Sequence, residues 1–166
     1  MKKALNPDDY SNWQLFSLTF LRVLIGWQFL YEGMVKLLAS PSWSAKSYLL
    51  GSVGPIAPFF REMAAHPTLL NVVDFLNVWG LILIGISLFI GLLSRPCKLA
   101  GIFLLLLYYF AYPPIAALGV NPQAEGSYWI VNKNLIELAA LLVLYLFPTS
   151  LITGIDRFFK TKTITT

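Results

Sequence analysis

Four long apolar stretches divide the chain, and prolines, glycines or charged residues bound each of them. They cover residues 14–39, 69–93, 98–118 and 129–147. A helix rises about 1.5 Å per residue, so each stretch is long enough to cross a hydrocarbon core of roughly 30 Å. The pattern predicts an all-α fold, in which residues 1–166 form one domain built as an integral membrane four-helix bundle.

The segment between the first two stretches, residues 40–67, has a different character. It mixes aromatic residues with Ser, Gly and four prolines, Pro41, Pro55, Pro58 and Pro67. Prolines interrupt helices, so the segment is too broken to span a membrane, yet it is too hydrophobic for a solvated loop. We predict short helices at about 44–51 and 56–65 that lie in the membrane interface. The segment would act as a lid over an opening in the bundle or as a simple connector packed on it.

Composition agrees with a membrane protein. Hydrophobic residues make up 57% of the chain, charged residues only 12%, and the mean hydropathy is +0.69. Soluble domains carry about 25% charged residues, roughly twice as many. The net charge of +4 comes without a basic cluster interleaved with exposed aromatics, so we expect no nucleic-acid partner. The single cysteine, Cys97, excludes an internal disulfide and a CxxC pair.

The basic residues predict an orientation in the membrane. Four spans place both termini on one side, together with the turn at 94–98. That side carries most of the basic residues: Lys2, Lys3, Arg95, Lys98, Arg157, Lys160 and Lys162. The other side has Lys46, Arg61 and Lys133, with Lys36 near the end of its helix. Because positive charges are enriched in cytoplasmic loops, both termini are predicted to be cytoplasmic.

The first apolar stretch carries three charges, Arg22, Glu32 and Lys36. At about 100° per residue, Arg22 and Lys36 share one helical stripe with Gly26, Phe29 and Gly33, and Glu32 lies beside it. Charges within a membrane segment usually face a bundle interior and mark a functional site. The glycines would also allow a neighbouring helix to approach closely. Alternatively, the cations snorkel to the interface, and Glu32 merely pairs with Lys36.

The predicted topology brings polar residues of all four helices to one level in the outer half of the bundle, with Arg22 deeper. The expected pocket has two carboxylates in a catalytic, proton-carrying role, Glu32 and Glu137. Its substrate- or quinone-binding residues would be Arg22, Lys36, Asp74, Asn77, Tyr108, Tyr112 and Asn134. The cations would hold a small anion or a ring carbonyl, and the tyrosines with Phe29 would wall a flat ligand such as a quinone. The alternative is a buried polar network that only fixes helix register.

No metal site is expected, because His66 and Cys97 are single and far apart in the chain. We also expect no covalently bound cofactor. Nothing in the sequence carries electrons by itself.

Three motifs, in order, resemble the DoxX/DoxD family of small bacterial membrane proteins. The first is Arg-x3-Gly-x6-Gly-x2-Lys, at Arg22, Gly26, Gly33 and Lys36. The second is the glycine-rich helix and basic turn of residues 80–101, and the third is Asn-x2-Glu at Asn134 and Glu137. Residues 154–157 are also similar to DoxD-type sequences. The motifs cover most of the chain except residues 40–67.

The resemblance implies a multi-pass protein of the bacterial cytoplasmic (inner) membrane, and some family members are subunits of thiosulfate:quinone oxidoreductase. It therefore favours a quinone-linked redox subunit that works with a protein partner, surrounded by membrane lipid. The alternative is a non-catalytic anchor that organises partner proteins, with residues 40–67 as the docking surface. A small transporter is less favoured, because the four helices show no internal repeat.

Overall fold

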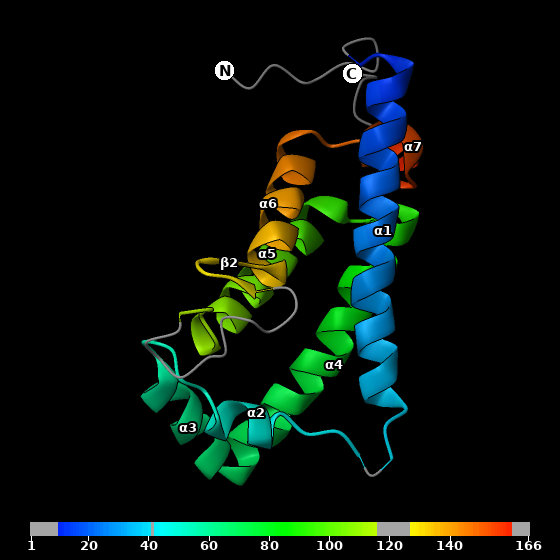
Figure 1. Ribbon diagram of the computed structural model, residues 1–166. Coiled ribbons are helices and arrows are strands. Elements are labelled where there is room, and N and C mark those ends of the chain that lie inside the picture. The colour runs from blue at the N-terminus through cyan, green and yellow to red at the C-terminus, as the bar shows by residue number, and fades with distance from the viewer. Residues whose placement is uncertain (1–9, 41, 116–126, 161–166) are drawn as a thin grey trace.

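Each long apolar stretch of the sequence contains an α-helix in the computed structural model, which describes residues 10–40, 42–115 and 127–160. The long helices are α1 (Asn12–Leu37), α4 (Pro67–Ile90), α5 (Ser94–Ala111) and α6 (Lys133–Leu146). The short ones are α2 (Lys46–Leu50), α3 (Ala57–Ala65), α7 (Ser150–Thr153) and α8 (Asp156–Lys160). A pair of antiparallel two-residue strands, β1 (Ser127–Tyr128) and β2 (Val131–Asn132), precedes α6 (Figure 1). The prediction of a helical fold is confirmed.

Several sequence-based expectations lie outside the described residues. They are the polar lead-in at 1–9 with Lys2 and Lys3, the proline at 41, the end of the third apolar stretch and the loop at 116–126, and the end of the basic tail at 161–166.

α1 and α4 form the most intimate helix pair, because glycines lie where their backbones meet. A Cβ atom added to Gly26 would lie 2.8 Å from the backbone nitrogen of Phe89. One added to Gly85 of α4 would lie 2.5 Å from the backbone nitrogen of Leu30. Small residues at such crossings let membrane helices approach closely. The predicted role of the glycines on the first helix is confirmed.

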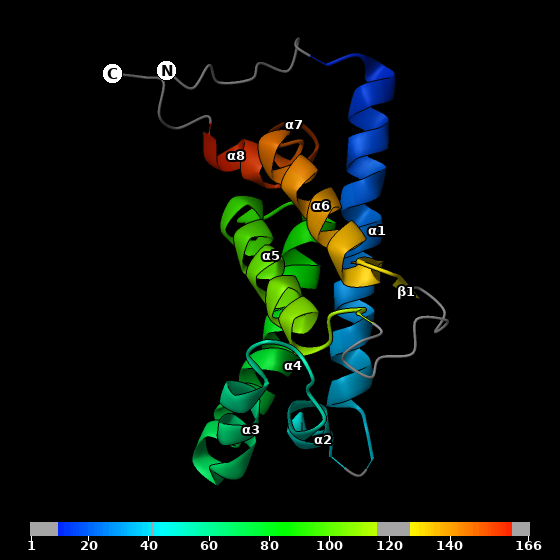
Figure 2. The same cartoon turned by 60° about the vertical axis from the view of Figure 1, so that its left-hand side comes forward.

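The four long helices contact one another in a ring: α1 packs on α4, α4 on α5, α5 on α6, and α6 back on α1 (Figure 2). Apolar side chains from all four fill the centre of this ring. They are Ile25, Phe29, Leu81, Ile84, Leu88, Leu105, Leu141 and Leu144. This core lies next to α7, α8 and the turn between α4 and α5, which form one end of the molecule (Figures 1 and 2).

The turn between α4 and α5 differs from the predicted one. The sequence predicted a basic turn at 94–98, but α5 already begins at Ser94, and the chain reverses at Gly91 and Leu93, both with positive φ. Pro96 is tolerated because the first turn of a helix needs no backbone donor there. The carboxylate of Asp156 accepts hydrogen bonds from the backbone nitrogens of Leu93 (2.7 Å) and Ser94 (3.2 Å), which caps α5.

The segment between α1 and α4 holds two short helices, α2 and α3, where the sequence predicted them. They cover the other end of the molecule, away from α7 and α8 (Figure 1). Asp74 of α4 holds the segment by accepting a hydrogen bond from the backbone nitrogen of Ala45 at 2.7 Å. The carbonyl of Ala111, at the end of α5, accepts from the backbone nitrogens of Val53 and Gly54, each at 3.1 Å. The segment is therefore fixed to both α4 and α5.

Among the described helices, α4 is the one that is long and apolar enough to cross a membrane by length and composition. α1 has 26 residues but includes three charges, and α5 has 18 residues with Arg95 and Lys98 near its start. α6 has 14 residues, which corresponds to about 21 Å. The number of membrane spans therefore stays a prediction.

Candidate functional site

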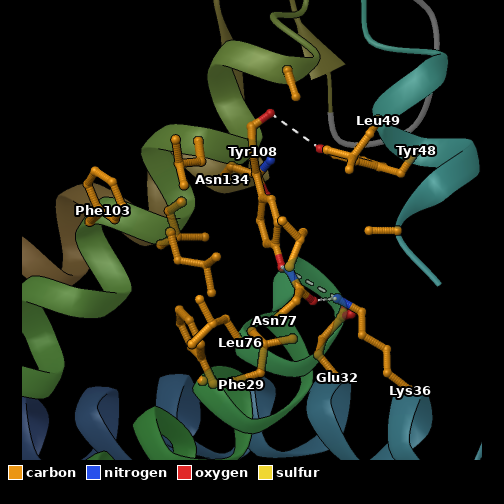
Figure 3. A pocket seen from close by; sticks show the side chains of 18 of the residues that line it. Phe29, Glu32, Lys36, Tyr48, Leu49, Leu76, Asn77, Phe103, Tyr108 and Asn134 are labelled. Carbon is orange, nitrogen blue, oxygen red and sulfur yellow. Dashed lines mark hydrogen bonds between the residues drawn. The ribbon is translucent and has the colours of Figure 1, made fainter. Parts of the chain in front are cut away.

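A cavity of about 730 Å³ lies among the long helices on the side of α2 and α3. All six helices from α1 to α6 contribute to its lining, which is mainly apolar. Its volume is in the range of pockets that hold small organic ligands. Figure 3 shows Lys36, Glu32 and Asn77 close together on one side of the cavity, with Phe103 on the opposite side.

Lys36, Asn77 and Tyr108 form the polar centre of the cavity. The Nζ atom of Lys36 donates to Oδ1 of Asn77 at 2.9 Å and to the hydroxyl oxygen of Tyr108 at 3.4 Å. Nδ2 of Asn77 donates to the same Tyr108 hydroxyl at 2.7 Å. The ammonium group also lies 4.7 Å from the centre of the Trp43 ring, a distance suited to a cation–π contact. The cation is thus held by three residues from three different parts of the chain.

Two carboxylates lie between α1 and α6. Glu137 accepts a hydrogen bond from the side-chain amide of Gln28. Glu32 is 3.9 Å from Nζ of Lys133, and both side chains of this pair are substantially exposed. Exposed pairs contribute little to stability, and the Glu32 carboxylate is accessible to water.

The structure brings six of the nine predicted site residues to this one cavity. They are Glu32, Lys36, Asn77, Tyr108, Asn134 and Glu137. Figure 3 shows Tyr108 pointing toward Asn77 across the cavity, with Asn134 beside it. These six residues therefore line one cavity, and whether they act in binding or catalysis stays a prediction.

Asp74 and Tyr112 do not line the cavity. Successive helical residues turn by about 100°, so Asp74 points about 60° away from Asn77, toward the backbone of Ala45. Tyr112 was expected to share a helical face with Tyr108. However, α5 ends at Ala111, one residue before Tyr112, so Tyr112 is not part of the helix. The Tyr112 hydroxyl instead donates to the carbonyl of Tyr48 at 2.8 Å. Both residues support the segment that covers the cavity.

Arg22 also lies outside the cavity, at the other end of the molecule. The helical rise places it about 21 Å from Lys36 along α1. Its side chain is 2% exposed and donates from Nη1 to the Thr149 hydroxyl at 3.3 Å, and Nε has no hydrogen-bond partner among the described residues. Arg22 therefore does not line this cavity with the other residues, and a role for it in ligand binding stays a prediction.

Lys98 was missed as a buried residue, because the sequence placed it in an exposed basic turn. It is fully buried and donates from Nζ to the carbonyl of Leu144 at 2.9 Å. Nearby, the hydroxyls of Ser94 and Ser150 are hydrogen-bonded at 2.6 Å. The end of the bundle near α7 therefore has its own buried polar cluster. It joins the end of α6 and α7 to α1 and α5.

Other lining residues were also missed. Gln28 lies one helical turn before Glu32 and was detectable by that spacing. Trp43 and Tyr48 were missed because they lie in the segment between α1 and α4, and only the fold of that segment brings them to the cavity. Gly80 belongs to the glycine-rich motif of the second apolar stretch, but the motif did not indicate that it lines a cavity.

An apolar cavity with one cationic, hydrogen-bonding end is suited to a ligand that is largely hydrophobic and has a polar group at one end. Ligand pockets are commonly apolar with a few polar groups that orient the ligand, and helical bundles build such sites from side chains of facing helices. The DoxX family model matches residues 17–113, more than half of the chain. The chain belongs to the DoxX family, which is a family of membrane proteins.

The matched range has two consequences for the motifs. It includes residues 40–67, which the sequence motifs left out, and seven of the nine expected site residues, from Arg22 to Tyr112. It ends before Asn134 and Glu137. No curated protein and no solved structure matches the chain.

Proposed function

We propose that this DoxX protein is the quinone-binding membrane subunit of an oxidoreductase in the bacterial cytoplasmic membrane. The observation that supports the proposal is the mainly apolar cavity with the Lys36–Asn77–Tyr108 cluster at one end. In this account the four long helices cross the membrane and both termini are cytoplasmic.

A quinone ring suits the chemistry of this cluster. Its carbonyl oxygen accepts hydrogen bonds, and the Lys36 ammonium group and the Tyr108 hydroxyl are donors that face the cavity. A charged donor gives a stronger hydrogen bond than a neutral one. Trp43, Phe29 and Tyr108 supply aromatic surface against which a flat ring would pack.

Reduction of the ring requires two electrons and two protons. A partner redox protein would supply the electrons, and the quinone would accept them. Glu32 and Glu137 would deliver the protons to the two ring oxygens: Glu32 from water at the exposed side, and Glu137 at the wall formed with Gln28. Each carboxylate would then be reprotonated from the solvent.

The proposal is tested by direct binding of decylubiquinone to the purified full chain in nanodiscs. Lys36→Gln should weaken binding about tenfold, equal to roughly 1.4 kcal/mol, because it removes one charge-assisted hydrogen bond. Lys46→Gln is the matched control, because Lys46 is exposed on α2 and does not line the cavity. The proposal fails if the unsubstituted chain shows no saturable binding, or if both variants bind equally well.

A non-catalytic anchoring role is the second candidate. It is favoured by the fact that Lys36, Asn77 and Tyr108 satisfy one another without a ligand. In that case Lys36→Gln would lower the thermal stability of the protein. Decylubiquinone would bind neither the unsubstituted chain nor the Lys36→Gln variant. The two candidates therefore give different results in the same experiment.

A further inference from the structure

The cavity has two sides of opposite chemistry. On the side of α1 and α6, Glu32 and Lys133 are charged and substantially exposed. On the side of α3, α4 and α5, the lining residues that are also exposed at the surface are apolar. They are Ala100 and three large residues, Phe59, Leu76 and Phe103, whose exposed fractions are 59%, 61% and 63%. In a membrane, the charged side of the cavity would suit contact with water, and the apolar side would suit contact with lipid.

Gly80 of α4 lines the cavity and has open space beside it. A Cβ atom added there would meet nothing within 4 Å. The other glycines of the α1–α4 contact are in tight backbone contact, so Gly80 is not needed for that packing. Glycine costs a helix interior roughly 1 kcal/mol relative to alanine. Its presence here leaves space between α4 and α5 where a larger side chain would intrude.

We propose that the ligand enters the cavity sideways from the membrane, between α4 and α5 past Gly80, and that its hydrocarbon tail stays in this opening when it is bound. The inference rests on the proposed function, since it concerns the same cavity. The ligand class is an amphipathic molecule with a polar ring and one long apolar tail. The ring contacts Lys36 and Tyr108, and the tail passes Leu76 and Phe103 into the lipid, so no apolar surface is exposed to water.

The test compares two probes on the full chain in nanodiscs: decylubiquinone, which has a tail, and duroquinone, which has none. Gly80→Phe fills the opening and should weaken decylubiquinone binding about tenfold, roughly 1.4 kcal/mol, while leaving duroquinone binding unchanged. Leu83→Phe is the matched control, since Leu83 is exposed on the same helix and does not line the cavity. Should Gly80→Phe not fold, Phe103→Ala removes tail contacts and should weaken decylubiquinone binding alone.

The outcomes separate the two proposals. If the unsubstituted chain binds neither quinone, the proposed function is wrong and the lateral opening falls with it. If it binds both, but Gly80→Phe or Phe103→Ala affects the two probes equally or not at all, the quinone site stands and the lateral opening is overturned.

Discussion

Lys36 and Arg22 are both cations of the first helix and both belong to the DoxX motif, yet their surroundings differ. Lys36 faces the cavity and contacts Asn77, Tyr108 and the Trp43 ring. Arg22 is buried among residues that connect helix ends and contacts Thr149. Helical spacing predicted that they share a stripe, and they do. Helical spacing could not predict that the stripe passes two separate polar clusters. Thr149, at the start of α7, is 127 residues away from Arg22 in the chain, so only the folded structure brings the two together.

Arg22 is expected to act in stability and not in ligand binding. Arg22→Ala should lower the free energy of unfolding by about 2–5 kcal/mol, because it leaves a cavity and removes the hydrogen bond to Thr149. Thermal unfolding of the purified chain measures the loss. Arg95→Ala, at an exposed position of α5, should change stability by no more than about 0.5 kcal/mol. A loss of decylubiquinone binding at full stability would contradict this assignment.

At the scale of elements, the sequence predicted which segments are helical better than where they end. Apolar runs and prolines located α1 to α4, including the short α2 and α3. The start of α5 was misplaced because its cap, Asp156, comes from the far end of the chain. The four long helices each contribute polar residues to the cavity, as the predicted gathering of polar residues from all four stretches suggested. Two predicted residues do not line the cavity. Tyr112 lies just after the last residue of α5, and Asp74 points about 60° away from Asn77 around α4.

The segment of α2 and α3 is expected to depend on Asp74. Asp74→Ala removes the acceptor for the Ala45 backbone nitrogen, and a hydrogen bond to a charged group is worth about 1.5–3 kcal/mol. Amide hydrogen exchange across residues 45–50 should therefore become about ten- to a hundredfold faster. Asp74→Asn keeps an acceptor oxygen and should show a smaller change. Unchanged exchange in both variants would show that the segment is held by its apolar contacts alone.

At the scale of the molecule, the two ends differ. One end carries α7, α8 and the turn into α5, and the other carries α2 and α3 (Figure 1). The proposed orientation places the first end in the cytoplasm. The native Cys97, near the start of α5, should react with a membrane-impermeant maleimide in inside-out vesicles only. In a Cys97→Ser background, Ser47→Cys on α2 should react in right-side-out vesicles only. Reaction of both cysteines from the same face would contradict the four-span topology.

The central claim is that the cavity binds a quinone, and photoaffinity labelling tests it most directly. The full chain in liposomes is illuminated with an azidoquinone, and cross-linked residues are mapped by mass spectrometry. We expect labels on the cavity-lining parts of α1, α4, α5 and α6, lost with excess decylubiquinone and reduced in Lys36→Gln. Labels restricted to the outer aromatic face of α1, around Trp13 and Phe20, and insensitive to competition, would contradict the claim.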